Sequence, residues 1–407
     1  MLITGVLAFG FTSCKKKGCT DATATNFNEK AKKDDGSCLY DTIDENTIYV
    51  TANVTSNTTW ETGKIYILST RVAVVSGVTL TIEPGVIVKG EAGTGANATC
   101  LIVARGGNIM AEGTATQPII FTSVADEIQP GQIASPNLDP DLKGLWGGLL
   151  ILGYAPISAD AESLQIEGIP ASDQNGLYGG TDATDNSGVI SYISIRHGGT
   201  NIGEGNEING LTLGGVGSGT TIEHIEILAN QDDGVEFFGG TVNVSHLIAW
   251  NVGDDAIDTD QSWAGTLTNF IVFNAGDECM ELDGPEGTLV AKHTITNGSV
   301  SAGNALGLVD NDANSYVDMY NVYFFNIASP AVLDDTATFD AIPSDYVCTF
   351  ATLQTTLPTG GVLAEYFEDG SDAFTTEVTI GNNTVGVTVS DFTGWSWADL
   401  YGTLSGF

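Results

Sequence analysis

Basic side chains are scarce in this 407-residue sequence, which has 13 lysines and arginines against 51 aspartates and glutamates. The formal net charge at pH 7 is -38. A surface of this charge repels phosphate groups, so the composition argues strongly against nucleic acid or an anionic lipid surface as a partner. The imbalance grows beyond residue 33, where 49 acids face seven bases. The expected partners are therefore cations, neutral ligands or other proteins.

Long apolar runs are also missing, because no stretch approaches the ~18 to 20 apolar residues of a membrane-spanning helix. Residues 2–11 form a shorter run, which fits the apolar region of a secretory signal. Residues 11–14 (FTSC) then resemble a bacterial lipobox, although Phe11 stands where leucine is common and no basic segment precedes the run. The resemblance implies a signal peptide over residues 1–14 and a lipid on Cys14. It also implies export to the outer membrane or cell surface of a Gram-negative bacterium, with membrane contact only through that lipid.

Cysteine is sparse, with six residues at positions 14, 19, 38, 100, 279 and 348. If Cys14 carries a lipid, five remain and at least one lacks a disulfide partner. Residues 18–28 (GCTDATATNFN) and 34–38 (DDGSC) resemble a small module of secreted and surface proteins of Bacteroidota. The resemblance implies a disulfide between Cys19 and Cys38, which would hold together a segment too short to bury much core. Residues 15–43 are expected to be this module, either as a spacer or with Ca²⁺ held by its Asp and Asn side chains.

Helical periodicity of apolar residues is absent from the rest of the chain. Short runs rich in valine, isoleucine and threonine recur instead, for example at residues 64–68, 78–82 and 149–152, and glycine, asparagine and aspartate separate them. This pattern is typical of short β-strands joined by turns.

A repeat of 22 to 23 residues runs through the centre of the chain. Acidic pairs begin at Asp232, Asp254 and Asp277, and a second acid follows each pair at the same step. A β-rich repeat of this length indicates one coil of a solenoid, in which equivalent residues stack about 4.8 Å apart. Asparagines recur at intervals of 21, 23 and 23 residues and predict an internal ladder of amides at a turn. These asparagines are Asn230, Asn251, Asn274 and Asn297.

Five segments resemble the right-handed parallel β-helix of the pectate-lyase-like superfamily, and especially surface lipoproteins of Bacteroidota and proteobacteria with undefined activity. They are residues 80–85 (LTIEPG), 104–107 (ARGG), 144–148 (GLWGG), 195–199 (IRHGG) and 232–240 (DDGVEFFGG). The resemblance implies an all-β chain with a parallel β-helix over residues 44–330. Residues 331–407, where the period is lost, are expected to form a β-rich C-terminal cap.

Stacking of the coils would place nine acids in three columns with little positive charge nearby. Two carboxylates about 5 Å apart repel by about 3 kcal/mol at an effective dielectric constant of 20, and Lys292 is the only base between residues 201 and 330. Either the pKa values rise or cations lie between the coils. Oxygen ligands without histidine or cysteine favour Ca²⁺ over Mg²⁺. The sequence therefore predicts a Ca²⁺ site, with a solvated acidic face that only keeps the protein soluble as the alternative. The columns are Asp232, Asp254 and Asp277; Asp233, Asp255 and Glu278; and Glu236, Asp258 and Glu281.

Catalytic motifs are present only in part. Residues 253–255 (GDD), with Asn230 and Asp232 upstream, resemble part of the polygalacturonase pattern, whose inverting hydrolysis uses a general acid and a base. The histidine and the Arg-x-Lys motif of that family are missing. A pectate lyase needs a base beside Ca²⁺, for which only Arg196 and Lys292 are available. The sequence favours a non-catalytic surface protein, with a polysaccharide lyase or glycoside hydrolase, or a purely structural protein, as alternatives.

Tryptophan supplies the remaining ligand candidate. Trp263 follows a turn and is expected to offer a platform on which a sugar ring stacks, whereas Trp250 directly precedes a ladder asparagine and is expected to pack in the core. The expected partner is a polysaccharide or another surface protein, and the chain is expected to be a monomer.

Overall fold

The computed structural model describes residues 16–22, 24, 26–39, 45–202, 208–328, 339, 343–368 and 370–407. The chain divides into two compact units, Met1–Thr47 and Ile48–Phe407. The predicted signal peptide and lipid site at Cys14 lie outside the described residues.

The first unit contains a disulfide between Cys19 and Cys38, with Cα atoms 4.7 Å apart. This confirms the predicted pairing. The Asn26 side chain donates to the carbonyl of Ser37 and accepts a 2.8 Å hydrogen bond from the backbone N–H of Leu39. The disulfide and this asparagine therefore tie the two ends of the module together.

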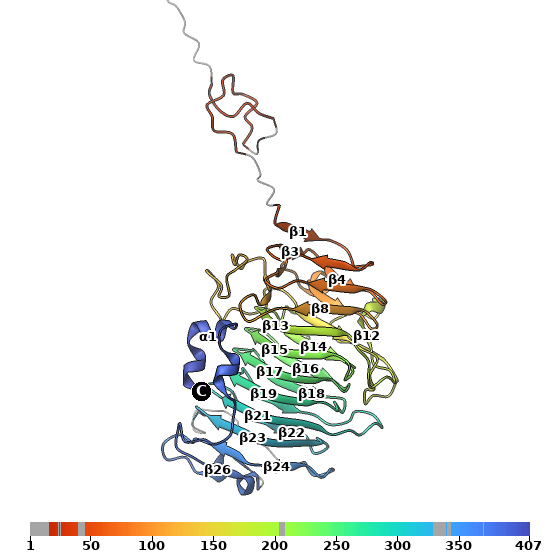
Figure 1. Ribbon diagram of the computed structural model, residues 1–407, viewed down its shortest axis with the longest axis vertical. Helices are drawn as coiled ribbons and strands as arrows, with labels where there is room; N and C mark the ends of the chain where they lie inside the picture. The colour runs from red at the N-terminus through yellow and green to blue at the C-terminus, as the bar shows by residue number, and fades with distance from the viewer. Residues whose placement is uncertain are drawn as a thin grey trace, which may run out of the picture. The chain divides into compact units, whose positions relative to one another are not determined.

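The second unit is a right-handed parallel β-helix, in which strands of successive coils pair in parallel, as the stacked arrows in Figure 1 show. This confirms the predicted fold class. One sheet has eight short strands. They are β4 (Arg71–Val74), β7 (Cys100–Val103), β10 (Leu149–Leu152), β14 (Leu211–Gly214), β16 (Val235–Phe238), β18 (Ile257–Asp260), β20 (Glu281–Leu282) and β22 (Asp310–Asn311).

A second sheet has sixteen strands and includes the long strands of the central coils. It contains β1 (Thr47–Val50), β2 (Thr58–Trp60), β3 (Ile65–Leu68), β5 (Thr79–Ile82), β6 (Ile87–Gly90), β8 (Asn108–Glu112), β9 (Ile119–Ser123), β13 (Gly188–Arg196), β15 (Thr221–Leu228), β17 (Asn243–Trp250), β19 (Thr266–Phe273), β21 (His293–Ser301), β23 (Val317–Phe325), β24 (Thr349–Ala351), β25 (Leu353–Thr355) and β26 (Thr375–Glu377). A separate antiparallel pair, β11 (Leu164–Gln165) and β12 (Leu177–Tyr178), lies in the loop between β10 and β13.

Helical segments are short throughout the described chain. They are α1 (Trp397–Tyr401) and the 3₁₀ turns η1 (Gly95–Asn97), η2 (Gln174–Gly176), η3 (Leu363–Glu365), η4 (Ser371–Phe374), η5 (Val389–Phe392) and η6 (Thr403–Gly406). Within the described residues, none of the helices has the length and apolar character needed to cross a bilayer.

Each long strand bends at one residue with a left-handed backbone, a conformation that asparagine adopts more readily than most residues. Asn297 and Asn321 lie at this bend with φ near 58° and 59°, and the Asn321 amide donates to Asn297 Oδ1 at 3.2 Å. Asn251 and Asn274 lie instead after β17 and β19, where Asn274 Nδ2 donates to Asn251 Oδ1 at 2.9 Å. The structure therefore has two asparagine pairs at two different positions of the coil.

The predicted four-residue ladder is wrong in its first and last members. The register pairs Arg196 with Leu228 and Leu228 with Trp250, so the residue equivalent to Asn251 is Ala229 rather than Asn230. The next coil is longer than 23 residues, because Phe273 pairs with Ser301. A constant sequence interval therefore reaches a different part of that coil.

The interior of the coils is apolar, since alternate strand residues point inward. In β16, Val235 and Phe237 are fully buried in the core, and in the neighbouring long strands Ile225 and Leu247 are too. The outward neighbour Glu236 lies on the other face of its strand. Each coil buries its apolar face only by stacking on the next, which explains why the repeat is needed for stability.

The predicted cap region has two parts. Strands β24 and β25 pair with β23, and β26 pairs with β25, so the sheet continues beyond residue 330. Phe339 and Phe367 pack against the core of these coils. Residues 387–407, the C-terminal tail, fold back along β15, β17 and β19, where Trp397 packs near Trp250 (Figure 1).

Candidate metal centre

Parallel register places the predicted acids in columns. Glu236 of β16 pairs with Asp258 of β18, which pairs with Glu281 of β20, and Glu281 pairs with Asp310 of β22. Because strand side chains alternate, all four point away from the apolar interior. The sequence prediction of this column is confirmed.

The second column lies at the turns that precede these strands. The backbone N–H of Asp255 donates to Asp233 Oδ1 at 3.1 Å, and that of Glu278 donates to Asp255 Oδ1 at 2.7 Å. Each carboxylate therefore accepts a hydrogen bond from the next coil. The third column follows the same turns, since the backbone N–H of Asp277 donates to the carbonyl of Asp254 at 3.2 Å.

Most of the central acids are covered by protein rather than by water. Side chains of the loop between β10 and β13, including Ile157 and Tyr178, pack on Phe238 of β16 and its apolar neighbours. Glu236 is 8% exposed and Asp258 is 9% exposed. A freely solvated acidic face therefore does not describe these two carboxyls.

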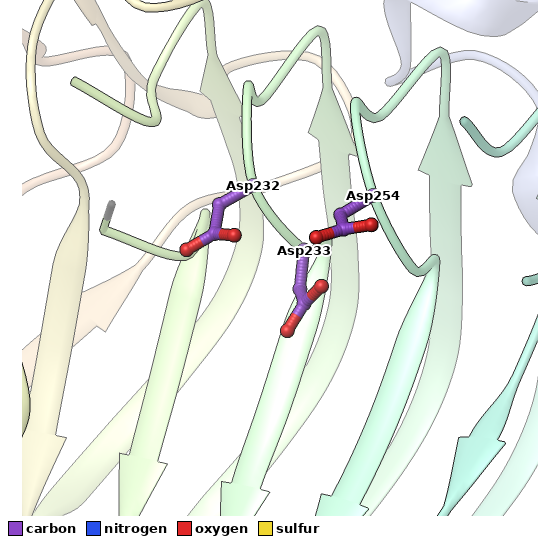
Figure 2. A group of neighbouring side chains, drawn as sticks. All are labelled: Asp232, Asp233 and Asp254. Atoms are coloured by element: carbon purple, nitrogen blue, oxygen red, sulfur yellow. The ribbon is translucent and has the colours of Figure 1, made fainter. Parts of the chain in front are cut away.

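Carboxylate oxygens converge at two overlapping places. One group consists of Asp232, Asp233 and Asp254, and the other of Asp233, Glu236 and Asp258. Within each group the ligand oxygens lie within 4.8 Å of one another. Figure 2 shows the first group at the turns that precede β16 and β18. Asp233 belongs to both groups and would be shared by ions bound at both.

One oxygen in the fully buried group lacks a hydrogen bond. Asp258 Oδ1 is buried and has no partner among the described residues. Asn209 Nδ2 donates to Glu236 Oε2, while Asn209 Oδ1 is also buried without a partner. A buried oxygen without a hydrogen bond costs about 1 to 3 kcal/mol. A cation among these oxygens would remove this cost.

The pKa values of the acids are raised because burial disfavours their charged forms. Burial and the neighbouring carboxylates raise the pKa of Asp233, Glu236 and Asp258 well above their ordinary values. At the more accessible part of the column, burial and neighbouring acids raise the pKa of Asp260 and Asp283 to about 7. The rise follows from proximity at about 3 kcal/mol for each pair of charges.

Glu278 and Asp255 show the same behaviour at the turns. Burial raises the pKa of Glu278 to about 7, and burial with the charge of Asp233 raises that of Asp255. Without a cation, several of these carboxyls would hold protons at neutral pH.

Positive side chains do not approach the columns in the described part of the chain. The three ion pairs found there join Arg71 to Asp173, Arg196 to Glu226 and Lys292 to Asp318. Arg196 and Lys292, the two candidates for a lyase base, are therefore engaged elsewhere. Nothing in this geometry places either beside the acidic columns.

The predicted sugar platform at Trp263 is wrong. Trp263 is 1% exposed, and its Nε1 donates to the carbonyl of Val242 at 3.0 Å. Its ring stacks on Phe237 with centroids 4.0 Å apart. The residue follows a turn, but its side chain points into the coil interior, where no sugar can reach it.

Sequence reasoning missed two features of this part of the molecule. Asn209 belongs to no acidic motif, and only the fold brings its amide to Glu236. Tyr401, in the C-terminal tail, is 60% exposed and lies 5.3 Å from Trp250 between ring centroids. Neither residue has a periodic signal in the sequence.

Comparison with known protein families gives one match, which covers residues 52–321 and is described as a pectate-lyase like beta helix domain. Neither a curated protein nor a solved structure matches the chain. The match spans the coils from the first strands to β23 and agrees with their parallel topology. The chain therefore belongs to the family of proteins with a pectate-lyase like beta helix domain.

Proposed function

We propose that the protein is an exported cell-envelope lipoprotein that binds a polysaccharide or another surface protein without cleaving it. In this proposal Ca²⁺ bound along the acidic columns stabilises the central coils. One observation carries it: the buried Asp258 carboxylate has an oxygen without a partner and lies within 4.8 Å of carboxylate oxygens from Asp233 and Glu236.

The ligand chemistry supports Ca²⁺ over other metals. Ca²⁺ takes six to eight oxygen ligands at about 2.3 to 2.6 Å in flexible geometry. The three buried carboxyls offer six oxygens, two from each side chain, and the Asn209 carbonyl oxygen is a further candidate. No histidine or cysteine belongs to either described group, which disfavours zinc and other softer metals.

Thermal melting in Ca²⁺ and in chelator tests the metal part of the proposal. Millimolar Ca²⁺ should raise the melting temperature at fixed ionic strength, and equimolar Mg²⁺ should do so much less. Asp258→Asn should remove most of the Ca²⁺ effect. Glu112→Gln, at an exposed acid on β8, is the matched control and should keep it. Equal effects of Ca²⁺ and Mg²⁺ on wild type would contradict the proposal.

The lipid anchor needs its own test, because its evidence is the lipobox resemblance at residues 11–14. Protein isolated from native membranes should begin at Cys14 and carry acyl chains detectable by mass spectrometry. Cys14→Ser should release the protein from the membrane fraction. An unprocessed chain that starts at Met1 and fractionates with the cytosol would contradict the anchor.

Polysaccharide cleavage is the second candidate function. The pKa values of about 7 at Asp260 and Asp283 suit a general acid at neutral pH, because such a group holds its proton until the reaction needs it. New reducing ends or unsaturated products, lost in Asp260→Asn, would favour this function over simple binding.

A further inference from the structure

We propose that a groove between the C-terminal tail and the turns after β17 and β19 binds a neutral glycan chain. This inference rests on the proposed function only for its ligand class, a polysaccharide, and it supplies the binding site that Trp263 does not. The groove is called the tail groove and is lined by Pro140, Trp250, Asn251, Asn274 and Tyr401 among others.

The tail groove consists of two adjoining hollows. One has a volume of about 450 Å³ and lies between the tail and the turns that contain Asn251 and Asn274. The other, of about 330 Å³, lies between Trp397 and the loop of residues 135–140. Both are lined by Pro140 and Tyr401, so Tyr401 stands where they meet. The sizes fall within the ~300 to 1,000 Å³ typical of ligand sites.

Aromatic rings form one side of this groove. Tyr401 is 60% exposed, and its ring is held beside the buried Trp250 at a centroid distance of 5.3 Å. Phe273 follows in the next coil, edge-on to Trp250 at 6.3 Å. The apolar faces of sugar rings pack on such aromatic faces, and an exposed ring backed by a second ring is already held in place.

Polar groups form a line beside the rings. Asn274 Nδ2 donates to Asn251 Oδ1 at 2.9 Å, and Asn251 Nδ2 donates to Asp141 Oδ1 at 2.6 Å. Amide and carboxylate groups pair with sugar hydroxyls because they offer donors and acceptors in one plane. The two asparagines belong to successive coils about 4.8 Å apart, a spacing close to the length of one sugar ring. An extended glycan running along the stack would therefore meet a similar amide at each coil.

Charge selects the kind of glycan. Asp141 lines the larger hollow and Asp139 the smaller, and no lysine or arginine is among the lining residues of either in the described chain. Carboxylates or sulfates on a sugar would be repelled here. The tail groove therefore fits a neutral polysaccharide rather than a polyuronate.

Affinity gel electrophoresis with soluble polysaccharides tests this site. The probes are hydroxyethylcellulose, xyloglucan and galactomannan as neutral chains, and polygalacturonate as the acidic chain. At least one neutral probe should retard the wild-type protein. Tyr401→Ala should weaken that binding about tenfold, the loss expected for one ring stacking interaction of about 1.4 kcal/mol. Tyr401→Phe should bind as wild type, because it keeps the ring.

Tyr49→Ala is the matched control, because Tyr49 is 61% exposed on β1 and lies outside the tail groove. It should bind as wild type, and both alanine variants should keep the wild-type melting temperature within about 2 °C. Equal binding by wild type and Tyr401→Ala would overturn the tail groove and leave polysaccharide binding at another site. Preference for polygalacturonate would overturn the neutral class. No retardation by any probe would overturn both this inference and the polysaccharide part of the proposed function.

Discussion

In the absence of divalent cations, the β-helix should lose stability as the pH rises from 4 to 8. Asp260, Glu278 and Asp283 have pKa values of about 7 in the folded protein, against 3.8 to 4.5 ordinarily. Between pH 4 and 7 the unfolded chain releases these protons while the folded chain still holds them. The stabilisation is therefore fully present below pH 4 and is lost as the pH rises through 7.

The magnitude follows from the same values. A rise of the Asp260 pKa from 3.8 to about 7 corresponds to about 4 kcal/mol, at about 1.4 kcal/mol for each pH unit. Glu278 and Asp283 are about half exposed, and water screens their charges, so we count about 1 kcal/mol for each. The total of about 6 kcal/mol is comparable to the whole stability of many domains. For a unit of this size it lowers the melting temperature by about 8 °C.

The assay is differential scanning calorimetry in EGTA at constant ionic strength, at pH values from 4 to 8. Asp260→Asn serves as the internal test, because an amide keeps the acceptor for the Gln261 N–H but cannot ionise. This variant should lose more than half of the pH dependence. Saturating Ca²⁺ at pH 8 should restore about 3 kcal/mol for each ion at a concentration 100 times its Kd. A melting temperature that stays level or rises from pH 4 to 8 in EGTA would refute the reasoning.

Three further predictions concern packing, the tail and the disulfide module. Trp263→Ala should lower the free energy of unfolding by about 3 to 5 kcal/mol in urea melts and leave glycan binding unchanged, because the ring is core. Glu226→Ala should cost about 3 to 5 kcal/mol, because it leaves Arg196 buried without its partner and removes the acceptor of two tail N–H groups. Limited proteolysis should then cut the C-terminal tail first. Reduction of Cys19–Cys38 should leave the main calorimetric transition unchanged, since the disulfide lies in the other compact unit.

Periodicity was sufficient to predict the fold and the stacking of the acids. Glu236, Asp258 and Glu281 keep one interval in the sequence, and parallel strands with equal turns convert that interval into adjacency. The same reasoning failed at Asn297, because an added length of chain before β21 changes the register without changing the composition. Sequence spacing is therefore reliable only between coils of equal length.

Burial and contacts from distant segments could not be predicted in this way. The loop between β10 and β13 covers Glu236 and raises its pKa, yet that loop lies far from the repeat in sequence. Trp263 follows a turn, as an exposed platform would, but its ring turns inward to Phe237. The tail groove depends on residues 397–403 folding back onto β17, which no local pattern in the tail indicates.

Anomalous diffraction from crystals grown in Ca²⁺ tests the central claim most directly, because it locates the ion without reference to stability. The account predicts a calcium peak at about 2.3 to 2.6 Å from carboxylate oxygens of Asp233, Glu236 and Asp258, and its loss in Asp258→Asn crystals. A well-ordered wild-type map with these three carboxyls in direct contact and no calcium peak among them would contradict it.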